Sequence, residues 1–351
     1  MKLLFIPSLR VDGLEDVIYA GLNSIPNISL HEFRFKPTYH NEYPNIKYAL
    51  GISELTPHWI RQSGKQSNKV YSTTDEIDFD QFDYIILGSL REDVLPFLPT
   101  ILKSSGSRLV YLDGEDDPFI RFIKMRIAIY FKREKLSDMR SFFNGVNKQN
   151  ITSAYSFQKS KISNLFYSAL LPQIPPIKNS IVALNMSVIK HSFPKIDDFD
   201  IDVSLVARPT NKLRVRFINA LRKIAKKHGL KVYLNTTGVN HLQYREMLLR
   251  SRVCISLPGA GFDTFRYWEI PFYERCLLSF KLPIEIPNNF EDGYSAIFFK
   301  SEEELEDKIL KTLNSGAYDD LRKNGKQDFL LYHTDVKRAE RVLHCMNQKN
   351  I

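Results

Sequence analysis

Short apolar runs alternate with amphipathic or polar stretches along most of the chain. In the first half, such runs cover residues 3–7, 82–87, 108–112 and 127–131, and residues 14–24 have the periodicity of a helix. Near-continuous apolar runs of this length are typical of buried parallel strands, and the segments between them leave room for crossover helices. The first half is therefore predicted to form a parallel α/β sheet, with long loops between residues 33 and 74.

The second half repeats this architecture. Strands are predicted at 202–207, 231–234, 253–257 and 276–280, and helices at 213–228, 241–250, 263–275 and 302–314. The charged last segment, about 319–346, is predicted to be helical. A proline cluster at 171–176 indicates a linker, so we expect two α/β domains divided near residue 175.

Composition narrows the class of protein. The chain has 351 residues, enough for two domains with a core each. No apolar run approaches the ~18 residues that span a bilayer, and the N-terminal apolar stretch is too short for a secretion signal. Three cysteines without a CxxC pair argue against a disulfide scaffold or a structural zinc site. We expect a soluble, cytoplasmic protein.

The charge balance suggests what the protein binds. Lys and Arg number 49 against 40 Asp and Glu, which gives a net charge of +9. Such an excess favours an anionic partner, such as nucleic acid, a membrane surface or a phosphorylated substrate. The positive charge is spread along the chain rather than gathered in one arm, which weakens the nucleic-acid interpretation. The alternative is a basic protein whose charge has no particular partner.

In open parallel sheets, ligands bind beyond the carboxyl ends of the strands. The residues that follow the predicted strands of the second half are therefore candidates for a binding site. They are Arg208, Thr210, Thr237, Gly259, Gly261, Phe262 and Thr264.

The Gly259-Ala260-Gly261 turn leads into a predicted helix, an arrangement that presents backbone N–H groups to an anion such as a diphosphate. Arg266 and Glu269 lie one turn apart on that helix and can face one ligand. Arginine suits phosphate oxygens, and a carboxylate can accept ribose hydroxyl groups. The alternative is an ordinary Arg–Glu salt bridge on a solvated helix face.

Residues 252–280, RVCISLPGAGFDTFRYWEIPFYERCLLSF, resemble the donor-binding segment of GT-B glycosyltransferases of the "glycosyl transferases group 1" kind. The Arg-x-Trp-Glu of residues 266–269 is also similar to the nucleotide-binding helix of phage DNA β-glucosyltransferases. The resemblance implies that Arg266 and Arg208 bind the diphosphate and that Glu269 binds the ribose. The usual Glu-x7-Glu is missing, because counting on from Glu269 places the second acid at Leu277.

The resemblance also implies a GT-B-like fold of two Rossmann-like parallel-sheet domains that face a cleft. Residues 1–175 would bind the acceptor and residues 176–330 the nucleotide sugar, while a C-terminal helix at 331–351 would pack back on the first domain. No cofactor is expected, since a nucleotide-diphosphate sugar, most simply a UDP-sugar, is the co-substrate.

The first half carries the candidates for catalysis. Asp113 and Glu115 follow a predicted buried strand and are candidate general bases that activate an acceptor hydroxyl. The alternative is that this acidic loop caps the next helix, with Asp116 or Asp117 before Pro118. Arg10, Asp12 and Gly13 follow the first strand and should line the acceptor side of the cleft, although a plain turn explains them equally well.

A metal site is the remaining interpretation of the acidic loop. The loop contains no Asp-x-Asp, and the Asp-x-Asp spacings at 78/80 and at 198/200/202 precede strands, away from the cleft. We therefore expect metal-independent chemistry.

These features predict a glycosyltransferase that moves a sugar from a nucleotide-diphosphate sugar to a cell-surface glycan or lipid-linked saccharide, with peripheral association with an anionic membrane surface as a possibility. One alternative keeps the chemistry but modifies DNA, in which case binding should be sensitive to salt. The other is a catalytically inactive module that binds nucleotide sugars.

Overall fold

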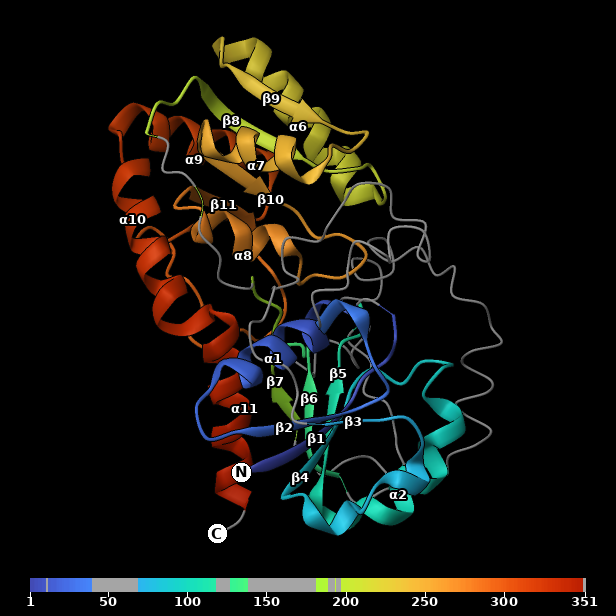
Figure 1. Cartoon of the computed structure of the whole chain (residues 1–351). Helices are drawn as coiled ribbons and strands as arrows, with labels where there is room; N and C mark the ends of the chain where they lie inside the picture. The colour runs from blue at the N-terminus through green and yellow to red at the C-terminus, as the bar shows by residue number, and fades with distance from the viewer. Residues whose placement is uncertain are drawn as a thin grey trace.

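The computed structural model describes residues 1–10, 12–39, 69–117, 127–137, 181–188, 193 and 197–349. Within these residues the chain forms two α/β domains, one above the other in Figure 1, and every strand pairing in their two sheets is parallel. The predicted fold class of two Rossmann-like domains is confirmed. The predicted linker at 171–176 lies outside the described residues.

The first domain is built on a sheet of seven strands in the order β3-β2-β1-β4-β5-β6-β7. The strands are β1 (Lys2–Ile6), β2 (Ser29–Phe33), β3 (Val70–Tyr71), β4 (Tyr84–Leu87), β5 (Leu109–Asp113), β6 (Ile127–Lys132) and β7 (Ile181–Ala183). Among the described residues, the α-helices of this domain are α1 (Gly13–Ser24) and α2 (Leu98–Ser105). Because β7 pairs with β6, the first sheet extends past residue 175, where the sequence analysis divides the domains.

The second domain has five strands in the order β12-β11-β10-β8-β9. They are β8 (Ile201–Val206), β9 (Val232–Asn235), β10 (Ser251–Ser256), β11 (Cys276–Phe280) and β12 (Ile297–Phe299). Its helices are α6 (Lys212–His228), α7 (His241–Leu249), α8 (Phe265–Phe272), α9 (Glu302–Ser315) and α10 (Tyr318–Asp328). Helix α8 begins two residues later than the predicted helix, because the turn before it occupies the chain as far as Thr264.

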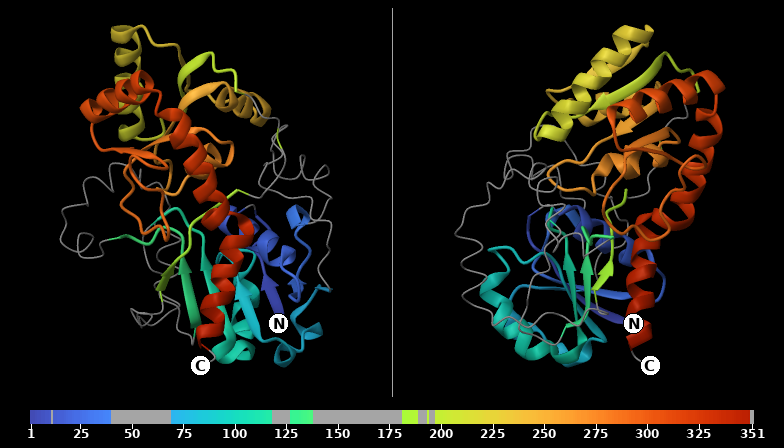
Figure 2. Two further views of the ribbon diagram at one scale, coloured as in Figure 1. Left: turned by 90° about the vertical axis from the view of Figure 1, so that its left-hand side faces the viewer. Right: turned by 180° about the vertical axis from the view of Figure 1, so that it is seen from behind.

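The C-terminal segment, which is predicted to be helical from about 319 to 346, contains two α-helices. Helix α10 ends in a π-helical turn at Phe329–His333, and α11 (Asp335–Lys349) follows. Figure 2 shows this segment running from the second domain down to the first. There α11 packs against α1, and the hydroxyl of Tyr84 donates a hydrogen bond to the carbonyl oxygen of Met346 at 2.7 Å. The C-terminal helix therefore crosses back to the first domain, as predicted.

The carboxyl ends of the two sheets face each other. A Cβ atom on Gly13, after β1, would lie 2.5 Å from Cζ of Phe265 at the start of α8. The segment after β6 forms an antiparallel bridge with the chain after β11, between Leu136 and Ile284. Loops that follow strands in both domains therefore meet at one interface, where open α/β sheets place their ligand sites.

Candidate functional site

Three loops of the second domain meet beside its sheet. They follow β8, β9 and β10, and the last one contains residues 258–263, which we call the glycine turn. Asn211 joins two of these loops: its Oδ1 accepts the N–H of Arg214 at 2.8 Å, which caps α6, and its Nδ2 donates to the carbonyl of Gly259 at 2.9 Å. The capping residue of one helix therefore fixes the turn that leads into another.

Arg214 lies under the glycine turn and is not among the site residues predicted from the sequence. Its Nε donates to the carbonyl of Pro258 at 2.7 Å, and a Cβ atom on Gly259 would lie only 2.8 Å from its Nη2. Glycine at 259 is therefore what lets the guanidinium approach the turn. One feature of the sequence could have indicated Arg214. It lies in the first turn of a helix, where the helix dipole disfavours a positive charge, so its presence there suggests another stabilising interaction.

Arg266 reaches the same region from the first turn of α8. Its guanidinium carbon lies 5.8 Å from the ring centre of Tyr244, and its buried Nε has no hydrogen-bond partner among the described residues. Burial and then the charge of Arg266 lower the pKa of Arg214 to about 10. Two guanidinium groups are thus close enough to repel each other.

The third arginine, Arg208, is exposed in the loop after β8 and lies against Gly238, where a Cβ atom would be 2.9 Å from its Nη2. Within the described part of the chain, no carboxylate forms an ion pair with Arg208, Arg214 or Arg266. Arginines gathered without a counter-charge beside a glycine turn form a site suited to a phosphate-bearing ligand.

Glu269 is buried, with 2% of its surface exposed, so the solvated salt bridge considered as an alternative does not describe it. Its Oε2 accepts a hydrogen bond from the hydroxyl of Tyr244 at 2.8 Å. Burial first, and then the charge of Glu269, raise the pKa of Tyr244 well above its ordinary value. Glu269 therefore supports the ring over which Arg266 lies, and its predicted contact with a ribose stays a prediction.

The remaining candidates of this domain lie around the glycine turn in different ways. The hydroxyl of Thr210 is 3.4 Å from Nη1 of Arg214, and Thr264 occupies the capping position of α8. Thr237 is exposed after β9. Phe262 is buried among Leu136, from the first domain, and Ile284, so its ring serves the domain interface.

Asp113 is buried in the first domain. Its carboxylate forms an ion pair with the buried Lys132 at 3.0 Å and accepts a hydrogen bond from the hydroxyl of Tyr130. Glu115 is the more accessible of the two predicted bases, with 12% of its side chain exposed and one carboxylate oxygen 3.7 Å from Nη2 of Arg91. Residues 118–126 lie outside the described residues, so the helix that Asp116 or Asp117 was expected to cap is not described.

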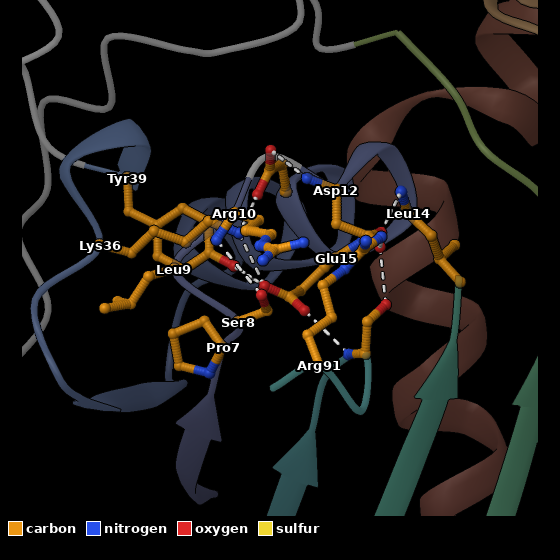
Figure 3. Close-up of polar contacts among 12 residues, drawn as sticks. Pro7, Ser8, Leu9, Arg10, Asp12, Leu14, Glu15, Lys36, Tyr39 and Arg91 are labelled. Atoms are coloured by element: carbon orange, nitrogen blue, oxygen red, sulfur yellow. Dashed lines mark hydrogen bonds and ion pairs between the residues drawn. The ribbon is translucent and has the colours of Figure 1, made fainter. Parts of the chain in front are cut away.

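The predicted acceptor side lies after β1 (Figure 3). Asp12 caps α1 by accepting the N–H groups of Leu14 and Glu15, both at 3.1 Å, and also accepts from Arg91 at 3.2 Å. Burial raises the pKa of Asp12, but the hydrogen bond from Ser89, the charges of Arg133 and Arg91 and the N–H of Glu15 together outweigh it, so the pKa is lowered. Arg10 is exposed and lies 3.5 Å from Glu92.

A buried charge cluster lies behind this edge and was not predicted (Figure 3). Lys36 Nζ is 2.7 Å from a carboxylate oxygen of both Glu15 and Asp16. Burial raises the pKa of Glu15 to about 7 and that of Asp16 to about 6, although Lys36 opposes both shifts. Two carboxylates thus share one ammonium group, which fixes the start of α1 to the segment after β2.

The described residues contain no group of three or more His, Cys, Asp or Glu side chains arranged to hold a metal ion. Nor do they contain a helix with both the length and the apolar character needed to cross a membrane.

A comparison with protein-family models finds no match to this sequence, and a comparison with curated proteins finds none either. Among solved structures, a glycosyltransferase from Rickettsia africae ESF-5 aligns over 99% of this chain and 98% of its own, with 9% sequence identity and a TM-score of 0.56. Anabaena HepE in complex with UDP and glucose aligns over 99% of this chain and 100% of its own, with 11% identity and a TM-score of 0.48.

TarM, named as an S. aureus protein, aligns over 75% of this chain with 13% identity and a TM-score of 0.44. The aligned part of the chain spans 54% of the length of TarM. The likeness to the Rickettsia structure extends over both chains and shows that this chain has the two-domain fold of that glycosyltransferase. The predicted GT-B fold is confirmed.

Proposed function

We propose that this protein is a glycosyltransferase that takes its sugar from a nucleoside diphosphate sugar. The second domain binds the donor and the first domain binds the acceptor. The observation that carries this proposal is the gathering of Arg208, Arg214 and Arg266 beside the glycine turn, without a carboxylate partner in the described part of the chain. Its support is the two-domain fold shared with a known glycosyltransferase.

The arginines define what the site does chemically. Breaking the bond between a sugar and a nucleoside diphosphate leaves growing negative charge on the diphosphate, and fixed positive groups stabilise that charge without reorganising. Arg214 is fixed by its bonds to the turn, whereas Arg266 keeps a donor available. The diphosphate would therefore lie between the glycine turn and these two side chains, with Arg208 at the exposed rim.

The proposed base is Glu115. It follows β5 at the edge of the first sheet that faces the second domain, and it is more accessible than Asp113, which is buried against Lys132. A carboxylate in this position can remove the proton of an acceptor hydroxyl as the sugar is transferred. Arg10, Asp12 and Gly13 would then line the acceptor side, and the chemistry would proceed without a metal ion.

The proposed acceptor is a hydroxyl of a cell-surface glycan or a lipid-linked saccharide. The net charge of +9 supports an acceptor or a surface with negative charge. Peripheral association with an anionic membrane would bring the protein to such an acceptor.

The test is a donor screen on the purified protein. We expect UDP-sugars or other nucleoside diphosphate sugars to raise the melting temperature. A donor present at 100 times its dissociation constant stabilises the folded protein by about 2.7 kcal/mol. With the correct acceptor, the nucleoside diphosphate is released. If the protein binds a nucleotide sugar but never releases the nucleoside diphosphate from it, with or without saccharide acceptors, it is instead an inactive binding module.

A further inference from the structure

Glu134 extends an acidic side chain from the first domain to the glycine turn of the second. It follows β6 and is fully buried. Its Oε2 accepts the backbone N–H of Phe262 at 2.8 Å, and its Oε1 accepts that of Asp263 at 2.9 Å. One carboxylate thus binds two consecutive N–H groups of the turn, and hydrogen bonds to an ionised acceptor are among the strong ones.

Gly261 is the residue that permits this contact. A Cβ atom at position 261 would lie 2.2 Å from Oε1 of Glu134, closer than real Cβ atoms approach an oxygen. A larger residue would displace the carboxylate from the turn. The second glycine of the turn is therefore matched to an acid that lies 127 residues earlier in the chain.

Both sides of this contact are fixed by their surroundings. After Glu134, the chain is bound to the second domain by the bridge between Leu136 and Ile284. At the other side, Oδ2 of Asp263 accepts the N–H of Met186 at 2.6 Å, and its Oδ1 accepts from Nε1 of Trp268 at 2.6 Å. The end of the turn is thus anchored to the chain that follows β7 as well as to Glu134.

The glycine turn also determines the geometry of the proposed diphosphate site. Its first residue, Pro258, binds Arg214, and its last residue lies three positions before Arg266. A shift of the turn would move the backbone between these two arginines. Because Glu134 binds the second half of the turn, the first domain contributes to the geometry of a site that otherwise belongs to the second.

We infer that Glu134 is a positioning residue that holds the glycine turn in its ligand-binding shape and makes the donor site depend on the apposition of the two domains. This inference rests on the proposed function. The carboxylate contacts the turn and acts on the diphosphate through it. Affinity for the diphosphate should therefore fall when Glu134 loses its charge, while affinity for a nucleoside without phosphates should not change.

The test compares Glu134→Gln with Glu285→Gln. Glu285 also joins the domains, through an ion pair with Lys135 at 2.7 Å, but it is 42% exposed and lies outside the turn. The first measurement is amide hydrogen exchange in peptides that contain Phe262 and Asp263. We expect faster exchange there in Glu134→Gln, because the amide presents an N–H₂ group to one of the two donors, and wild-type exchange in Glu285→Gln.

The second measurement is calorimetry with UDP and with uridine. We expect Glu134→Gln to weaken UDP binding at least about tenfold and to leave uridine binding unchanged, with Glu285→Gln equal to wild type in both. If Glu134→Gln fails to fold, Gly261→Ala displaces the same carboxylate while keeping its charge, and the same two changes are expected.

Unchanged exchange at Phe262 and Asp263 would overturn the inference. UDP binding equal to wild type would also overturn it, and tighter UDP binding would show that Glu134 competes with the diphosphate instead of shaping its site. If the wild-type protein binds no nucleoside diphosphate, the proposed function fails. The exchange comparison would still show whether Glu134 holds the turn.

Discussion

Arg214 and Arg266 lie close together beside the glycine turn, and no carboxylate forms an ion pair with either within the described residues. Burial and the charge of Arg266 lower the pKa of Arg214 to about 10. Arg214 also donates hydrogen bonds to the carbonyl groups of Pro258 and Arg208, so it has a structural role in the turn. An anion that binds between the two guanidinium groups, as the proposed function requires, would reduce their repulsion.

The role of Glu269 can be separated from that of Tyr244. If Glu269 binds the ribose, Glu269→Ala weakens nucleotide binding by about 1.5–3 kcal/mol, the range for hydrogen bonds to charged groups. Tyr244→Phe removes only the hydroxyl that Glu269 accepts and keeps the ring near Arg266. We expect calorimetry with UDP to show a smaller loss for Tyr244→Phe. Equal losses would mean that Glu269 acts through Tyr244 alone, and unchanged affinity in both folded variants would remove Glu269 from the site.

The two candidate bases should respond differently to loss of charge. Glu115→Gln is expected to lower turnover at least ~100-fold while donor affinity stays within about a factor of two. Asp113→Asn removes the closer of the two carboxylates that pair with the buried Lys132 and leaves Asp117, at 3.5 Å, as the remaining partner among the described residues, so it is expected to lower the free energy of unfolding by up to about 3–5 kcal/mol. Turnover and denaturant melts of both variants decide the assignment. A loss of turnover in Asp113→Asn at unchanged stability would make Asp113 the base, and normal turnover in both would place the base elsewhere.

The buried cluster around Lys36 makes stability depend on pH. The folded chain keeps protons on Glu15 up to a pKa of about 7, whereas its ordinary value is 4.5. Between these values the folded state binds more protons than the unfolded state, so the contribution of Glu15 to the free energy of unfolding falls as pH rises and levels off above about 7. Asp16, with a pKa raised to about 6, contributes in the same direction at lower pH.

Lys36→Met tests this cluster. At pH 8 it leaves two buried carboxylates without their ammonium partner and is expected to cost about 3–5 kcal/mol. At pH 5 the carboxylates are largely protonated, so the cost should be smaller. Urea melts at both pH values measure the difference, with the exposed Lys103→Met as control. A cost that is independent of pH would show that Lys36 acts through packing rather than through charge.

Chelation tests the expectation of metal-independent chemistry. Arginines and a helix N-terminus can neutralise a diphosphate, so transferase activity should survive an excess of EDTA. Loss of activity that manganese or magnesium restores would contradict this expectation. The acidic loop after β5 would then be the candidate metal site.

Much of the fold followed from continuous apolar runs. Strands such as β1, β4 and β10 are buried on both faces and so are visible in the sequence. Strand β2 was missed because His31 and Glu32 interrupt its apolar pattern, yet both are buried. Glu32 is accommodated there by the N–H of Lys36 at 3.2 Å, a partner that local patterning does not reveal.

The site was predictable to the extent that its residues follow strands. Arg208 was predicted by this rule, and Arg266 was predicted from its place in the first turn of the helix that follows the glycine turn. Arg214 was missed because it lies inside a helix, and Glu134 was missed because its partners are at Phe262 and Asp263, far along the chain. Contacts between distant loops arise from the packing of the two domains, which composition and periodicity do not specify.

The most direct test of the central claim is calorimetry of UDP and uridine binding to the wild-type protein and to Arg266→Ala. Arg216→Ala is the matched control. Arg216 is an arginine on a helix of the same domain, but it is exposed and pairs with Glu302. We predict that UDP binds much more tightly than uridine to the wild type, that Arg266→Ala weakens UDP binding by about 1.5–3 kcal/mol without affecting uridine, and that Arg216→Ala changes neither. Equal affinity for UDP and uridine, or UDP binding unaffected by Arg266→Ala, would contradict the assignment of the glycine turn and its arginines as a diphosphate site.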